Sequence, residues 1–155
     1  MNRKWIGLAA TSLLVAACGL VAAQDKKEHD EPETPLGKIM EKVQKLNGDM
    51  TRYVRNAAQY KKSQKDLEKA ALEFAKLAKE SKKFTDPYVK NVKDVKEPQK
   101  KWDDIMDAWE KTSKDLAAAV AKDSTTQKEA KELFQKVKNT CADCHTVFRV
   151  EKEAF

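Results

Sequence analysis

Four stretches of this chain repeat apolar residues at every third or fourth position, the period of a helix that buries one face. The first stretch begins at Leu36, the second ends near Phe84, the third begins at Trp102, and the fourth follows a polar turn at 123–126. In the first stretch the apolar positions are Leu36, Ile39, Met40, Val43, Leu46, Met50, Tyr53, Val54 and Ala57. No alternating strand pattern competes with these helices. The sequence therefore predicts an all-α protein, an antiparallel four-helix bundle with short connections.

Prolines and capping residues indicate where the helices begin and end. Asp86-Pro87 should end the second helix, and Pro98 closes a connecting segment that we expect to form a loop or a short helix. Before the fourth helix, Thr126 precedes Glu129 by the three residues of a capping box. We therefore expect the polar turn to supply the cap of the last helix.

The N-terminus has the features of an export signal. A basic start at Arg3 and Lys4 is followed by an apolar run to Ala23 and an abrupt change to charged residues. Residues 1–23 are therefore predicted to be a signal peptide. Cleavage after Ala23 would release the protein into the bacterial periplasm. A lipobox-like sequence ending at Cys18 would instead leave that cysteine lipidated and the protein tethered to the membrane, and the sequence leaves both alternatives open.

The rest of the chain divides into a short tether and one domain. Residues 24–35 are charged, contain two prolines and offer almost nothing to bury, so we expect a flexible tether. Residues 36–155 then form the bundle domain, a size that supports a single core. The chain has a formal net charge of +6, but its basic and acidic residues are interspersed. Nucleic-acid binding is therefore not indicated, and the surplus charge suggests a solvated surface with a mild preference for acidic partners.

The sequence CADCH near the C-terminus has the pattern Cys-x-x-Cys-His, a covalent attachment site for c-type haem. Thioethers from Cys141 and Cys144 would hold the porphyrin, and the imidazole of His145 would bind the iron; a helix brings all three to one side. A zinc site and a redox dithiol are the alternatives for such a cysteine pair. However, the remaining Cys18 and His29 lie far upstream, and no βαβ pattern is visible. We therefore predict one covalently bound haem c.

The motif and its surroundings resemble the class II cytochromes c, the cytochrome c prime family. The CADCHTVFR sequence that starts at Cys141 is similar to this family's Cys-x-x-Cys-His-x-x-Tyr/Phe-Arg ending, and Phe134 also fits. In the first helix, the GDM sequence at 48–50 resembles the family's Gly-x-Met segment. The resemblance covers about residues 36–150. It implies a four-helix bundle with one haem c, and it suggests that Arg149 lies near the proximal imidazole; the alternative for this residue is a solvated C-terminal charge.

The same resemblance places Met40 on the distal side of the haem. Low-spin members of the family carry a methionine there whose thioether binds the iron, whereas high-spin, gas-binding members carry an apolar residue and leave the iron five-coordinate. By this resemblance Met40 is the candidate sixth ligand, opposite His145. A methionine at such a helix position can also simply fill the core, with Ile39 or Val43 covering the haem instead. The family's usual arginine near a haem propionate is Leu36 here, which leaves propionate pairing unassigned.

Together these features predict an exported monohaem c-type cytochrome that carries single electrons through a His/Met-ligated iron. The alternative is a five-coordinate protein that binds nitric oxide or carbon monoxide, and a haem-free dithiol oxidoreductase is a third hypothesis. No acid, base or nucleophile constellation is visible, so we do not expect an enzyme. The expected partners are redox proteins, a homodimer is suggested by the resemblance, and a membrane is involved only if Cys18 is lipidated. Trp102 and Trp109, one heptad apart, are interpreted as core aromatics.

Overall fold

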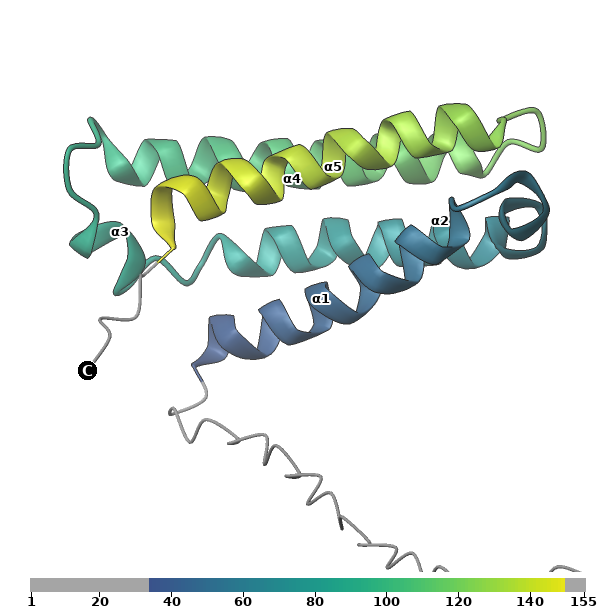
Figure 1. Ribbon diagram of the computed structural model, residues 1–155. Helices are drawn as coiled ribbons and strands as arrows, with labels where there is room; N and C mark the ends of the chain where they lie inside the picture. The colour runs from purple at the N-terminus through teal and green to yellow at the C-terminus, as the bar shows by residue number, and fades with distance from the viewer. Residues whose placement is uncertain (1–33, 150–155) are drawn as a thin grey trace, which may run out of the picture. The chain divides into compact units, whose positions relative to one another are not determined.

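The computed structural model describes residues 34–149, and this part of the chain is helical, without strands (Figure 1). Its helices are α1 (Pro35–Tyr53), α2 (Ala57–Ser81), α3 (Tyr88–Asn91), α4 (Pro98–Val120) and α5 (Gln127–Phe148). The four long helices form the antiparallel bundle predicted from the sequence, and α3 is one turn within the connection between α2 and α4. The predicted export signal, most of the predicted tether, and both Cys18 and His29 lie outside the described residues.

The start of α1 is determined by a cap and a proline. The hydroxyl of Thr34 accepts a hydrogen bond from the backbone N–H of Gly37 at 2.9 Å. Pro35 follows as the first helical residue, where its fixed backbone angle suits the helix and its missing N–H costs nothing. The helix therefore starts one residue before Leu36, the first position of the apolar pattern.

The first helix ends earlier than the apolar pattern predicts. That pattern continues through Val54 to Ala57, whereas α1 ends at Tyr53 and Ala57 is already the first residue of α2. The reason is local, because the Asn56 side chain accepts a hydrogen bond from the backbone N–H of Gln59 at 2.9 Å and so caps α2. Val54 is nevertheless buried. The pattern thus identified the burial of Val54 correctly, but Ala57 is exposed, and the pattern missed a turn that contains neither glycine nor proline.

The other boundaries follow the predicted breaks. α2 ends at Ser81, close to the predicted end near Phe84, and α4 begins at Pro98. At the start of α5, the Thr126 hydroxyl accepts a hydrogen bond from the Glu129 N–H at 3.2 Å, while the Glu129 carboxylate accepts one from the Thr126 N–H at 2.8 Å. This reciprocal pair confirms the capping box expected from the sequence.

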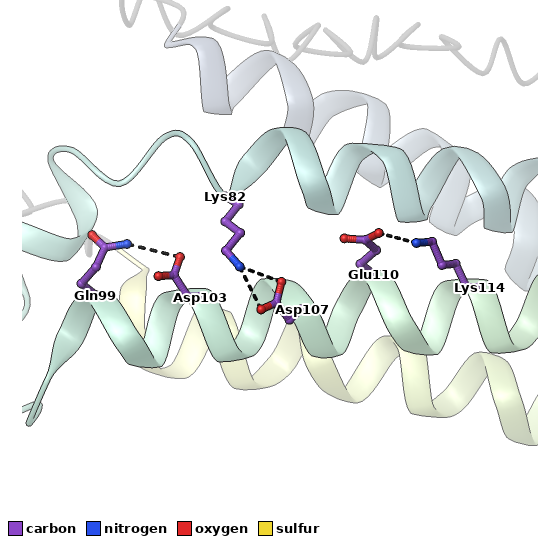
Figure 2. Close-up of polar contacts among 6 residues, drawn as sticks. All are labelled: Lys82, Gln99, Asp103, Asp107, Glu110 and Lys114. Atoms are coloured by element: carbon purple, nitrogen blue, oxygen red, sulfur yellow. Dashed lines mark hydrogen bonds and ion pairs between the residues drawn. The ribbon is translucent and has the colours of Figure 1, made fainter.

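α2 and α4 are the central pair of the bundle, with α1 packed on α2 and α5 packed on α4. Between α2 and α4, the rings of Phe74 and Trp109 meet edge to face with their centroids 5.7 Å apart. Both rings are buried, as is Trp102, which confirms the prediction that the two tryptophans are core aromatics. At the surface, Lys82 just after α2 reaches both carboxylate oxygens of Asp107 on α4 at 2.8 Å (Figure 2).

A hydrogen bond joins the end of α1 to the start of α5. The side-chain amide of Gln127, at the start of α5, donates a hydrogen bond to the backbone carbonyl of Val54, directly after α1. From that end the two helices diverge, so the start of α1 and the end of α5 lie further apart (Figure 1). The diverging end, which holds residues 141–148, is called the motif end below. None of the described helices is both long and apolar enough to cross a membrane.

Candidate haem site

The inward face of α5 changes character at the cysteine motif. Phe134, Val137 and Phe148 lie on this face and are buried, each at most 5% exposed. Between them, at the same helical spacing, stand Cys141 and Cys144, which are only half-buried. Two small thiols therefore occupy positions between the larger side chains of Val137 and Phe148. At the motif, therefore, the inward face of α5 is less completely covered than on either side of it.

Both thiols lie in apolar surroundings. The Cys141 S–H donates a weak hydrogen bond to the Val137 carbonyl one turn earlier, at 3.6 Å. Burial raises the pKa of the Cys141 thiol and raises the pKa of Cys144 to about 11, where the neighbouring Cys141 adds to the effect. Redox-active cysteines instead need a pKa below the ordinary value, so that one of them is a thiolate at neutral pH. The environment of these two thiols argues against the dithiol oxidoreductase.

His145 follows on the same helix, and its side chain is exposed. Its imidazole makes no hydrogen bond to another residue of the described chain, and its carbonyl accepts a bond from the backbone N–H of Arg149 at 3.3 Å. Steps of about 100° per residue place Cys141, Cys144 and His145 on one side of α5, as the sequence predicted. Within residues 34–149, no group of three or more histidine, cysteine, aspartate or glutamate side chains is arranged to hold a metal ion. The imidazole is thus free to bind an iron brought by a haem attached at the two thiols.

Aromatic rings pack against one another at the motif end. Phe148, three residues after His145, meets Trp102 of α4 edge to face at 5.1 Å between centroids. Trp102 in turn stacks on Tyr88 of α3 at 6.2 Å, and the Tyr88 hydroxyl lies 3.4 Å from the hydroxyl of Thr34, the cap of α1. These contacts connect all the elements that surround the motif. The apolar pattern did not single out Tyr88 as a site residue, because a one-turn helix has too few residues to show a period.

The same end of the bundle contains a buried hydrogen-bond donor without an acceptor. The indole N–H groups of Trp102 and Trp109 are buried and have no acceptor among the described residues, and Trp102 is the one in contact with Phe148. A buried donor without a partner is costly, so each such group calls for an explanation. Leu36, which the resemblance places at the position of the family's arginine, is buried and has no side-chain donor. The Trp102 N–H is a donor of the kind that a haem propionate accepts from.

The fold places Met40 at the same height along the bundle as the motif. Met40 lies fourteen residues before Val54, and Cys141 lies fourteen residues after Gln127. The hydrogen bond between Gln127 and Val54 joins these two helices, and a rise of 1.5 Å per residue puts both side chains about 21 Å from it. The structure thus brings the predicted distal residue and the predicted attachment residues to one level, on helices that diverge there.

The three methionines of the described chain differ in burial. Met50 is fully buried and Met106 is 2% exposed, so both belong to the core. Met40 is only half-buried and packs against the edge of the core. Its thioether is therefore the one that core packing leaves incompletely covered.

The residues around the motif fit a haem. The porphyrin is a flat apolar group that needs two thiols, a nitrogen ligand and apolar walls. The motif supplies the thiols and the imidazole, and the diverging helices carry half-buried apolar side chains around it. On α1 these are Met40 and Val43, and on α5 they are Cys144 and Val147. Such incompletely covered side chains gain from the burial that a haem provides.

A four-helix bundle with Cys-x-x-Cys-His on its last helix defines a class, the bundle-type c-type haem proteins. The family model described as Cytochrome C' matches residues 37–149 of this chain. Because the match covers most of the sequence, the chain belongs to the cytochrome c prime family, as the resemblance suggested. Proteins of this family bind one covalent haem c, which confirms the predicted cofactor. No curated protein and no solved structure matches the chain.

Proposed function

We propose that this protein is an exported carrier of single electrons, with its haem iron held between His145 and Met40 and its porphyrin attached at Cys141 and Cys144. The observation that carries the proposal is the position of Met40. It is the methionine that core packing leaves half-buried, and it lies level with the cysteine motif on the helix that faces it across the diverging end.

The bound haem supplies a one-electron ferric/ferrous couple, which histidine/methionine ligation shifts to higher potential. The protein's part is to hold two ligands in nearly one geometry in both oxidation states. His145 is positioned by α5, which is anchored on α4 through buried side chains on either side of the motif. Met40 is positioned by α1, whose buried Leu36 and Ile39 flank it toward the core. Rigid helices on both sides of the iron would keep the positions of the two ligands nearly the same when an electron is gained or lost.

The same proposal includes the setting in which the protein works. Haem c is attached on the outer side of the bacterial inner membrane, which agrees with an export signal in residues 1–23. Redox partners would dock briefly through complementary charge, since electron transfer requires fast association and release. We assign no enzymatic activity, because catalysis would need a positioned acid, base or nucleophile.

A second function is favoured by the family to which the chain belongs. Five-coordinate members bind small gases at the open side of the iron, and the family description Cytochrome C' agrees with that type. In this alternative Met40 turns toward the core and the half-buried Val43 or the buried Ile39 covers the distal face. The two functions differ in a single bond, from the Met40 sulfur to the iron.

The test is the visible and electron paramagnetic resonance spectrum of the haem-loaded protein and of three Met→Leu variants. We expect the wild type to be low-spin, with a ferric thioether-to-iron charge-transfer band that Met40→Leu abolishes. Met50→Leu and Met106→Leu are the matched controls, and both should keep the band because those side chains lie in the core. A high-spin wild type that binds nitric oxide or carbon monoxide equally well with and without Met40→Leu would establish the gas-binding function instead.

A further inference from the structure

The outward side of α2 is lined with lysines. Steps of about 100° per residue bring six of them into a sector of about 100°, over a length of about 27 Å. All six are exposed, and we call them the lysine face: Lys61, Lys62, Lys65, Lys69, Lys76 and Lys79. In the sequence these residues are mixed with acidic ones, so the clustering appears only when the helix is formed and its other sides are covered by α1 and α4.

The lysine face is poorly neutralised. Of its six ammonium groups, Lys76 makes an ion pair, with Glu73 at 3.9 Å, and the other five pair with no acidic residue of the described chain. The acids Glu68, Glu73 and Glu80 lie half-buried at its flanks. Asp66 lies on the side toward α1, where it lines a hollow with Lys69 and Glu73 of α2 and with three residues of α1, Leu46, Asp49 and Tyr53.

Three of the four lysines of α4 behave differently. Lys100, Lys111 and Lys114 each pair with a carboxylate one turn away on the same helix. Figure 2 shows one of these pairs, Glu110 with Lys114, beside the pair of Lys82 with Asp107. Most lysines of α4 are therefore paired within their own helix, whereas most lysines of the α2 face remain available to an external anion.

An apolar side chain lies in the middle of the lysine face. Leu72 is 51% exposed, and among residues 34–149 no other large hydrophobic side chain is exposed. Its position between Lys69 and Lys76 puts it in the same sector of the helix. A row of ammonium groups around one apolar side chain matches a surface with phosphates outside and hydrocarbon beneath.

We propose that the lysine face of α2 docks this protein on an anionic membrane surface, with lysines at lipid phosphates and Leu72 in the headgroup region. An acidic protein face is the other candidate, but protein interfaces are enriched in arginine and depleted in lysine, and this face has no arginine. Lysine is a hydrated point charge on a flexible stem, which suits mobile headgroups better than fixed carboxylates. Each lysine near such a surface adds to the attraction.

Docking through α2 keeps the haem site accessible. The cysteine motif is on α5, which packs on α4, whereas α2 packs mainly between α1 and α4. A protein lying on its α2 face would hold the motif end of α5 across the bundle from the membrane. Redox partners or gases could then reach it while the protein stays at the surface, and the inference holds whichever ligand occupies the iron's distal side.

The test is co-sedimentation of the haem-loaded protein with lipid vesicles. A Cys18→Ala background removes any lipid anchor, so that binding reports the folded domain. We compare vesicles of phosphatidylcholine alone with vesicles that also contain phosphatidylglycerol, at low salt and at about 0.5 M salt, where charges are strongly screened. Binding should require phosphatidylglycerol and low salt.

Two triple variants with the same change in net charge locate the binding surface. Lys65→Gln/Lys69→Gln/Lys76→Gln should weaken vesicle binding about 100-fold, at about fivefold per lysine. Lys122→Gln/Lys128→Gln/Lys131→Gln removes three exposed lysines outside α2 and should leave most of the binding intact. An unchanged haem spectrum and circular dichroism signal would show that both variants fold. If both variants lost vesicle binding equally, the binding would depend on net charge and not on the lysine face, and the proposal would be overturned.

A further variant and a second anion separate a membrane from an acidic protein. Leu72→Gln should weaken binding to the vesicles and leave binding to poly-glutamate unchanged. Poly-glutamate binding that depends on the three α2 lysines, without any vesicle binding at low salt, would assign the face to an acidic protein and overturn the membrane proposal.

Discussion

The side-chain amide of Gln127 donates a hydrogen bond to the backbone carbonyl of Val54, and this contact joins the end of α1 to the start of α5. It satisfies a carbonyl beyond the last turn of α1, which has no partner within the helix. It joins residues that lie 73 positions apart in the sequence, and Met40 and Cys141 each lie fourteen residues from this bonded pair along their helices. Residues at equal distances from this contact along α1 and α5 therefore lie at about the same level of the bundle.

Removing this contact should destabilise the protein modestly. We expect Gln127→Ala to lower the free energy of unfolding by about 1 kcal/mol, the usual net value of one intramolecular hydrogen bond. Urea denaturation of the haem-loaded protein is the measurement. Gln135→Ala is the control, because the Gln135 amide bonds only to Asn139 on the exposed surface of α5. Equal losses for the two variants would show that the contact with Val54 has no special role.

The capping box of α5 predicts a dependence on pH. Hydrogen bonds from the Thr126 backbone N–H, and then from its hydroxyl, lower the pKa of Glu129 below the ordinary glutamate value. A carboxyl with a lowered pKa stabilises the folded state above its unfolded-state pKa, and this contribution is lost as the pH falls through the folded-state value. Glu129→Gln should therefore be less stable than the wild type at pH 7, and the difference should disappear in acid.

Two further variants of the same helix check this effect. Thr126→Ala should lower the free energy of unfolding by about 1 kcal/mol, since it removes the N-cap side chain. Glu132→Gln changes an exposed glutamate that makes no hydrogen bond or ion pair within the described chain, so its stability should follow that of the wild type at every pH. A difference between Glu129→Gln and the wild type that persists at low pH would contradict the assignment.

Two leucines on α2 provide a matched test of the core. Leu67 is fully buried, whereas Leu72 is 51% exposed. Leu67→Ala should lower the free energy of unfolding by about 3 kcal/mol, because it leaves a cavity in the packed interior. Leu72→Ala should change it by no more than about 0.5 kcal/mol. Thermal unfolding of both variants distinguishes these outcomes, and a large loss for Leu72→Ala would mean that its side chain is covered in the folded protein.

The haem attachment can be tested one bond at a time. Cys144→Ala should keep the haem attached through Cys141 alone, and the pyridine haemochrome spectrum should shift to longer wavelength because one vinyl group remains unsaturated. Asp143→Ala, an exposed residue between the two thiols, should leave the spectrum unchanged. A wild-type spectrum in Cys144→Ala would show that this thiol makes no thioether.

Local sequence signals predicted the helices well because their causes are local. The box at Thr126 and the proline at the start of α4 involve neighbouring residues, so their effect can be read from spacing. The turn at Asn56 was missed because its local signal is weak. An asparagine cap is a weaker signal than proline or glycine, and the apolar period continued across it to Ala57.

The sequence by itself determined the helical class, the haem motif and the family, since each depends on residue types at fixed short spacings. Only the tertiary structure decided which methionines are buried, that Met40 stands level with Cys141, and that Tyr88, Trp102 and Phe148 gather beside the motif. It also decided that the lysines of α2 face outward as a group. These relationships depend on contacts between residues far apart in the chain, and such contacts form only when the apolar faces of the helices are buried against one another.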